Sequence, residues 1–183
     1  QHGNGAAGVM VGGQLGYRRL TGMAPGADLV VATDTLGGRE FAMTSFCIDE
    51  GARVVLHEYA PWVTYHLDGS SDVEQLIDET VGQGVVHVNP VGNLSGSRKG
   101  YEADVQAGQT TVIPIDVPPI DAHFAILTML YREPERPLHF TLTSPNGDAV
   151  DVPFQAPSFE MELGDFAVTG SFDVSDRGTA KLD

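Results

Sequence analysis

The sequence predicts an α/β core followed by an antiparallel β-sandwich, and three observations lead to that prediction. In residues 1–98, short apolar runs alternate with helical segments, which is typical of a parallel sheet covered on both faces. From about residue 99, β-rich runs follow one another between proline- and glycine-containing turns, as in a β-sandwich. The formal charge is 5 − 11 = −6 in residues 1–98 and 5 − 14 = −9 in residues 99–183. We therefore place the domain boundary near residues 96–100, with one domain over 1–98 and the other over 99–183.

The first elements of the α/β core follow directly from local patterns. The apolar run 29–32, which comes after the turn Ala24-Pro25-Gly26, predicts a buried strand. Residues 39–50 predict a helix that Gly51 closes, because glycine accepts the left-handed conformation of a helix C-terminus. The run 54–56 then predicts a second buried strand.

A second helix and a third strand complete the predicted core. Ser71-Asp72-Val73-Glu74 is a capping box, so a helix is expected over 72–82. The apolar face of that helix consists of Val73, Leu76, Ile77 and Val81. Glycines end it before the apolar run 85–88, and residues 27–90 thus predict three parallel strands with two helices.

The second half predicts strands only. Runs 110–117, 122–131 and 138–143 are β-rich, and Pro145-Asn146-Gly147 predicts a turn because Pro fixes φ and Gly accepts a positive φ. Apolar residues alternate with polar ones further on, at Phe159, Met161, Leu163, Phe172 and Val174. No helix is expected after Gln83, and we expect an antiparallel sandwich over 105–175.

Composition excludes several classes of partner. The formal charge is 10 − 25 = −15, which argues against nucleic acid and against anionic membranes, since both need a basic surface. No apolar run is long enough to span a bilayer. The single cysteine, Cys47, allows no internal disulfide and is expected to be a buried, inert thiol.

Motifs for cofactors are weak. The six histidines form no H-x-x-x-H or H-x-H pair, so a zinc site has little support. We expect no cofactor; a structural calcium ion is left open, although no calcium-binding loop motif occurs. Residues 3–8 read G-x-G-x-x-G, but a dinucleotide site would need a strand before them and an uninterrupted helix after them.

Several segments of residues 1–97 together resemble the subtilisin-like serine peptidases (subtilases). His2-Gly3 with Ala7-Gly8 is similar to the family's H-G-[TN]-x-x-A-G motif, and residues 22–27 are similar to its G-x-A-P-x-A turn. Residues 51–55 resemble the strand G-A-D-V-I, and Val91-Gly92-Asn93 resembles the A-G-N that ends a parallel strand. The resemblance implies part of a three-layer parallel-sheet core and an extracellular or cell-envelope location.

The resemblance also implies roles for four residues. His2 would open a buried helix and act as the general base, since a helix N-terminus favours the neutral imidazole that a base needs. Asn93 would donate its side-chain amide to the developing oxyanion. Tyr59 and Trp62 would line the substrate cleft within the loop 56–69, and the substrate would be a peptide or protein.

The chain departs from the family pattern in three places. The family's N-[ML]-S-[LFY]-G is replaced by Leu56-His57-Glu58-Tyr59-Ala60. No D-[ST]-G motif for the triad aspartate occurs, nor a G-T-S-x-[AS]-x-P motif for the nucleophilic serine. We therefore expect a fragment of a serine endopeptidase that is inactive alone and self-associates through its incomplete sheet.

The predicted sandwich is the basis of an alternative function. Residues 142–147 resemble the L-x-S-P-x-G turn of jelly-roll domains attached to secreted peptidases. The alternative function is a non-catalytic peptidase-like scaffold whose sandwich binds protein or carbohydrate.

Overall fold

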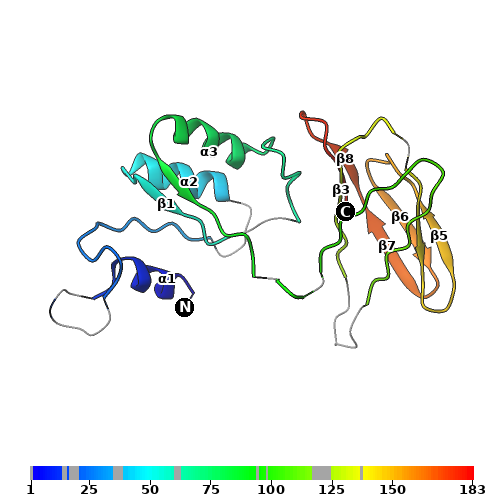
Figure 1. The fold of residues 1–183 in the computed structure, drawn as a ribbon, viewed down its shortest axis with the longest axis horizontal. Helices are drawn as coiled ribbons and strands as arrows, with labels where there is room; N and C mark the ends of the chain where they lie inside the picture. The colour runs from blue at the N-terminus through cyan, green and yellow to red at the C-terminus, as the bar shows by residue number, and fades with distance from the viewer. Residues whose placement is uncertain are drawn as a thin grey trace. The chain divides into compact units, whose positions relative to one another are not determined.

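The computed structural model describes residues 2–13, 16, 21–34, 39–59, 63–93, 95–97, 99–116, 125–136 and 138–183. The chain divides into two compact units (Figure 1). The first holds residues 1–60 and 71–91, and the second holds residues 61–70 and 92–183. Residues 61–70, which lie within the first predicted domain, thus belong to the second unit. The fold as a whole mixes helices with small sheets.

The first unit combines helices with a small parallel sheet. Its elements are α1 (His2–Val11), α2 (Glu40–Asp49), β1 (Val54–Leu56), α3 (Asp72–Gly82) and β2 (Val86–Val88). Strands β1 and β2 pair in parallel, with Val54 opposite Val86 and Leu56 opposite Val88. The pairing continues one residue further, because the His57 amide donates to the Val88 carbonyl at 2.9 Å. A parallel pair of strands needs a crossover connection, and the segment between β1 and β2, which contains α3, provides it.

The predicted helices 39–50 and 72–82 are confirmed as α2 and α3. Gly51 follows α2 at φ 91°, where the amides of Gly51 and Ala52 donate to the carbonyls of Ile48 and Cys47. The capping box of α3 is also present, because the Glu74 amide donates to Ser71 Oγ and the Ser71 amide donates to Glu74 Oε2. Of the predicted apolar face of α3, Val73 is buried, but Val81 is exposed.

The described residues show no parallel three-layer core, because their parallel sheet has two strands and not the predicted three. Residues 29–32, the predicted buried strand, pair with no other strand among the described residues. Leu29 and Val31 in this run are exposed. Apolar character alone predicts burial, whereas a strand also needs a neighbour that accepts its backbone hydrogen bonds. Helix α1 has no buried residue, so it is not the buried helix that the resemblance implies.

The second unit contains antiparallel strand pairs. Its strands are β3 (Met129–Tyr131), β4 (Phe140–Thr143), β5 (Ala149–Val152), β6 (Phe159–Leu163), β7 (Phe166–Gly170), β8 (Phe172–Val174) and β9 (Ala180–Leu182). They form a sheet of order β3-β9-β8 and the hairpins β4-β5 and β6-β7. The predicted turn joins β4 to β5, with Gly147 at φ 93° and its amide donating to the Ser144 carbonyl at 3.0 Å. The predicted alternation along β6 is also present, because its apolar residues are half-buried while Glu160 and Glu162 are exposed.

One predicted run of the second unit is wrong as a strand, and another is a strand only in part. Residues 110–116 form no strand, and Val112 is 81% exposed. Pro114 lies in this run and has no amide to contribute to a ladder. Of the run 122–131, only β3 is a strand, and residues 122–124 lie outside the described residues.

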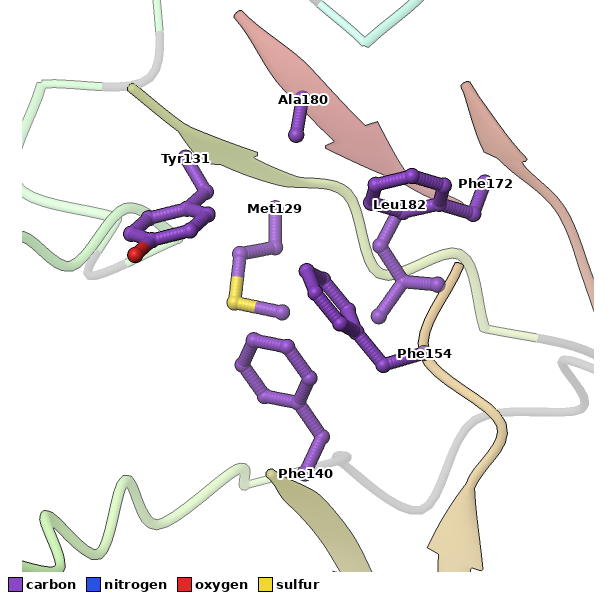
Figure 2. Close-up of a pocket in the computed structure, with 7 residues that line it drawn as sticks. All are labelled: Met129, Tyr131, Phe140, Phe154, Phe172, Ala180 and Leu182. Carbon is purple, nitrogen blue, oxygen red and sulfur yellow. The ribbon is translucent and has the colours of Figure 1, made fainter. Parts of the chain in front are cut away.

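An aromatic cluster connects several strands of the second unit. Figure 2 shows Phe154 among the apolar side chains of the β3-β9-β8 sheet and of β4. The Phe154 ring centroid lies 4.7 Å from that of Phe172, 5.4 Å from that of Phe140 and 6.4 Å from that of Tyr131. Tilted and edge-on pairs at these separations are favourable, so Phe154 connects strands that belong to different sheets.

Candidate functional site

His2 is the first residue of α1 and stands beside an acidic side chain. Its Nδ1 atom lies 3.0 Å from Oε2 of Glu58, which follows β1. The His2 side chain is 83% exposed and the Glu58 side chain is 34% exposed. The imidazole is therefore open to solvent on most sides, and the carboxylate that faces it is partly exposed.

The turn that follows α1 matches the second motif of the resemblance and has a clear packing role. The amides of Met23 and Ala24 donate to the carbonyls of Val9 and Met10, at 2.9 and 2.7 Å. A Cβ at Gly22 would lie 2.6 Å from the Met10 carbonyl oxygen, so the close approach requires glycine. Residues 22–24 thus satisfy carbonyls that the end of α1 leaves unpaired.

Glu58 was not among the predicted site residues. In the sequence it is part of a segment that departs from the family pattern, and nothing in its spacing connects it with His2. The one signal in the sequence is its position two residues after the predicted strand 54–56, because side chains at the carboxyl end of a parallel strand commonly line sites.

Asn93, the predicted oxyanion donor, is an exposed residue of a bend that follows β2. Gly92 precedes it at φ 89°, a conformation that favours glycine. Asn93 belongs to the second unit and His2 to the first. Their convergence on one peptide carbonyl therefore stays a prediction.

The two predicted cleft residues have different outcomes. The Tyr59 hydroxyl donates a hydrogen bond of 3.1 Å to the backbone carbonyl of Asp34, so this exposed side chain connects the end of β1 with the segment 28–34. Trp62 lies outside the described residues. A role of Tyr59 in lining a cleft stays a prediction.

A chain of hydrogen bonds runs from α3 through β2 to the residue after β1. The Thr80 hydroxyl donates to the Leu76 carbonyl at 2.7 Å and lies 2.9 Å from His87 Nε2. His87 Nδ1 lies in turn 3.0 Å from His57 Nε2. Since the Thr80 hydrogen is already donated, His87 carries its proton on Nε2 and accepts from His57 Nε2–H.

Burial keeps these two imidazoles neutral. Desolvation lowers the pKa of His57, and the neighbouring His87 lowers it further. Desolvation also lowers the pKa of His87. The rings are stacked at 5.3 Å. His87, a half-buried residue of β2, thus has a hydrogen-bond partner at each ring nitrogen.

Cys47 of α2 is half-buried, and desolvation raises the pKa of its thiol although a hydrogen bond with the Ala32 backbone opposes the shift. A raised pKa keeps the thiol protonated and weakly nucleophilic.

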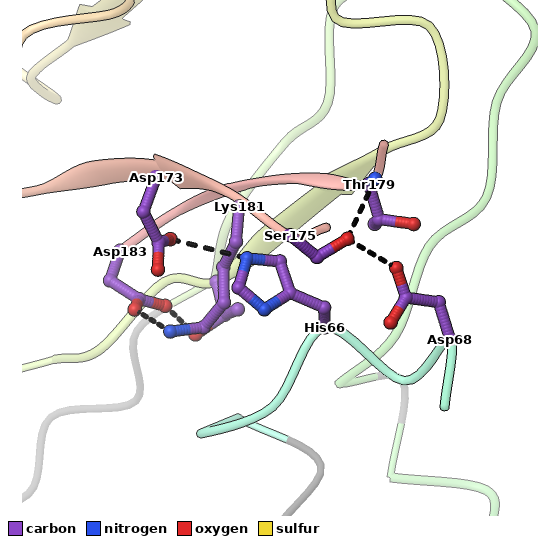
Figure 3. Close-up of polar contacts among 8 residues, drawn as sticks. His66, Asp68, Asp173, Ser175, Thr179, Lys181 and Asp183 are labelled. Atoms are coloured by element: carbon purple, nitrogen blue, oxygen red, sulfur yellow. Dashed lines mark hydrogen bonds and ion pairs between the residues drawn. The ribbon is translucent and has the colours of Figure 1, made fainter. Parts of the chain in front are cut away.

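In the second unit, residues 66–70 pack against the β8-β9 hairpin (Figure 3). The Ser175 hydroxyl donates to Asp68 Oδ2 at 2.5 Å, and Arg177 Nη1 donates to the Asp68 carbonyl at 3.0 Å. His66 Nε2 lies 3.4 Å from Asp173 Oδ1. Burial acts to raise the pKa of Asp68, but the hydrogen bonds from Ser175, Ser70 and Thr179 outweigh it and hold that pKa well below its usual range.

Across the described residues, no three His, Cys, Asp or Glu side chains are grouped so that they could hold a metal ion. No helix in the same part of the chain is long and apolar enough to cross a membrane.

Comparison of the chain with protein-family models, with curated proteins and with solved structures finds no match.

Proposed function

We propose that the chain is part of a subtilisin-like serine endopeptidase, with His2 as the general base and Asn93 as an oxyanion donor. The observation that carries the proposal is the order of the sequence landmarks along the chain together with the local structure at each. His2 opens a helix, residues 22–24 bond back to the end of that helix, β1 follows residues 51–53, and Asn93 follows β2. Each landmark alone is weak; their order is what favours the peptidase.

The proposed chemistry is acyl transfer from a peptide bond to a serine. His2 accepts the serine proton as the hydroxyl oxygen attacks the peptide carbonyl, and then gives the proton to the leaving amine. The Asn93 side-chain amide donates a hydrogen bond to the oxyanion that forms. The serine and the aspartate of the triad are expected from further parts of the parent protein. In the same proposal, the chain comprises part of a three-layer core followed by a jelly-roll-like sandwich. The parent protein is exported.

Peptide hydrolysis by the longer gene product tests the proposal. In a product that includes D-[ST]-G and G-T-S motifs, Asn93→Ala is expected to lower kcat by roughly 10²–10³ with little change in KM, because the oxyanion exists only during the reaction. Asn146→Ala, which changes an exposed asparagine in the β4-β5 turn, serves as the control. Absence of hydrolysis, or full activity of the Asn93→Ala variant, would refute the proposal. Binding of protein or carbohydrate without hydrolysis would support the scaffold instead.

A further inference from the structure

Residues 66–70 directly precede, in the sequence, the border between the two units. They belong to the second unit, whereas α3 of the first unit begins right after them with Ser71 as its N-cap. We infer that residues 66–70 are a strap: contacts with the β8-β9 hairpin hold the strap, and the held strap fixes the N-terminus of α3. The stability of the hairpin and that of the helix start are thereby coupled along the chain.

Asp68 joins the strap to the hairpin through two of its oxygens. The Ser175 hydroxyl donates to Asp68 Oδ2 at 2.5 Å, and Arg177 Nη1 donates to the Asp68 carbonyl at 3.0 Å, from 107 and 109 positions away in the sequence. The hairpin turn is itself fixed, because the Thr179 amide donates to Ser175 Oγ and the Ser175 amide donates to the Thr179 carbonyl. The hairpin therefore positions the hydroxyl that holds Asp68.

The strap lies on the polar face of the β3-β9-β8 sheet. Asp173 of β8 pairs with Lys181 of β9, so their side chains share one face, while Phe172 and Leu182 point to the face of the aromatic cluster. His66 Nε2 of the strap lies 3.4 Å from Asp173 Oδ1 (Figure 3). Polar contacts with this face are thus what hold the strap.

The backbone of the strap depends on these contacts. Leu67 has φ 54°, in the left-handed region that leucine rarely adopts, and such a conformation persists only where surrounding contacts hold it. Gly69 has φ 81°, and a Cβ there would lie 2.5 Å from Arg177 Nη1. Glycine therefore lets the guanidinium reach the Asp68 carbonyl, and loss of the hairpin contacts should release the strap.

A short series of hydrogen bonds connects Asp68 with α3. Asp68 Oδ1 accepts from the Ser70 amide at 3.1 Å, and the hydroxyl of the next residue, Ser71, accepts from the Glu74 amide. An N-cap residue needs an extended backbone, and Ser71 has φ −72° and ψ 152°. Because Ser70 precedes Ser71, a fixed Ser70 limits the conformations of the cap, and release of the strap should loosen it.

Amide hydrogen exchange of the 183-residue chain, followed by NMR, tests the coupling. In Ser175→Ala, exchange of the Ser70 amide should accelerate roughly five-fold, as expected from the loss of one hydrogen bond to a charged, partly exposed group. The Glu74 amide should accelerate roughly two- to five-fold, and five-fold is the limit reached if the cap opens only after the strap is released. Arg177→Ala, which leaves the backbone hydrogen bonds of the hairpin turn in place, should accelerate both amides about two-fold.

Two controls separate this coupling from a general loosening of the second unit. Ser171→Ala changes an exposed serine next to β8 and should leave both amides unaffected. In Ser175→Ala, the Ser144 amide, which donates to the Asp148 carbonyl in the β4-β5 turn, should exchange at the wild-type rate.

Acceleration at Ser70 and Glu74 alone, in both variants, is the expected result. Acceleration at Ser70 without acceleration at Glu74 would show a held strap that is not coupled to α3, and would overturn the inference. An unchanged Ser70 amide would refute the strap itself. Equal acceleration at Ser70, Glu74 and Ser144 would show general destabilisation and would also contradict the coupling.

Discussion

At the scale of single residues, polar side chains from different elements hydrogen-bond to one another. Thr80 of α3 contacts His87 of β2, and His87 contacts His57, which follows β1. In the second unit, Asp68 accepts a hydrogen bond from Ser175, a residue far away in the sequence. Polar atoms that lose water on folding need such partners, because an unsatisfied one costs about 1–3 kcal/mol.

The histidine pair predicts a pH dependence of stability. Burial lowers the pKa of both His57 and His87, so the unfolded chain binds more protons than the folded chain near pH 6. The stabilisation is complete above the unfolded pKa of about 6.5 and declines as pH falls below it. Urea unfolding between pH 5 and 8 should show this slope. It should weaken in His57→Gln and persist in His139→Gln, which removes an exposed histidine; equal slopes in both variants would contradict the account.

The contact between Asp68 and Ser175 predicts a stability effect in the second unit. Ser175→Ala should lower the free energy of unfolding by about 1 kcal/mol, since it removes a hydrogen bond to a charged, partly exposed group. Because the pKa of Asp68 is held low, its contribution is present above about pH 4 and is lost as pH falls. Ser171→Ala, next to β8, is the matched control, and an effect as large as that of Ser175→Ala would argue against the contact.

At the scale of the elements, the ends of the helices and the faces of the parallel sheet determine the predicted effects on stability and association. The capping box fixes the start of α3, and Gly51 fixes the end of α2. The parallel sheet has one covered face, which includes buried Val55, and one open face. The exposed valines of the open face are Val54, Val86 and Val88.

Removal of the cap should loosen α3. Ser71→Ala is expected to cost about 1 kcal/mol, because the first-turn amides lose their side-chain acceptor. Amide hydrogen exchange at the start of α3 should accelerate by roughly five-fold, the factor that this free energy corresponds to. Ser97→Ala, at an exposed position, should change nothing. Unchanged exchange in the Ser71→Ala variant would show that packing alone holds this end of the helix.

The open face predicts self-association. Val86→Ser, which removes apolar surface from that face, should weaken association, since contiguous exposed apolar side chains favour contacts between chains. Light scattering over a range of concentrations measures the effect, with Val112→Ser, an exposed valine in the second unit, as control. A monomer at high concentration would contradict this prediction.

At the scale of the whole molecule, local signals were predictable and long-range ones were not. The capping box, the glycine after α2 and the alternation in β6 depend on neighbours in sequence, and all three are present. The runs 29–32 and 110–116 have strand-like composition but no ladder partner among the described residues. Such partners come from distant sequence, which periodicity does not reveal.

The candidate site follows the same division. A helix begins at His2, as the resemblance implies, but none of its residues is buried. The contact between His2, which begins α1, and Glu58, which follows β1, joins residues far apart in the sequence. A segment that only departs from a family pattern gives no indication of that contact.

Labelling with a fluorophosphonate probe tests the central claim most directly, because the probe reacts with a serine only when a base activates it. The account predicts no labelling of the 183-residue chain, and labelling of a longer gene product that carries both triad motifs, abolished by His2→Ala. Stoichiometric labelling of Ser95 or Ser97 in the 183-residue chain, or no labelling of the longer product, would contradict it.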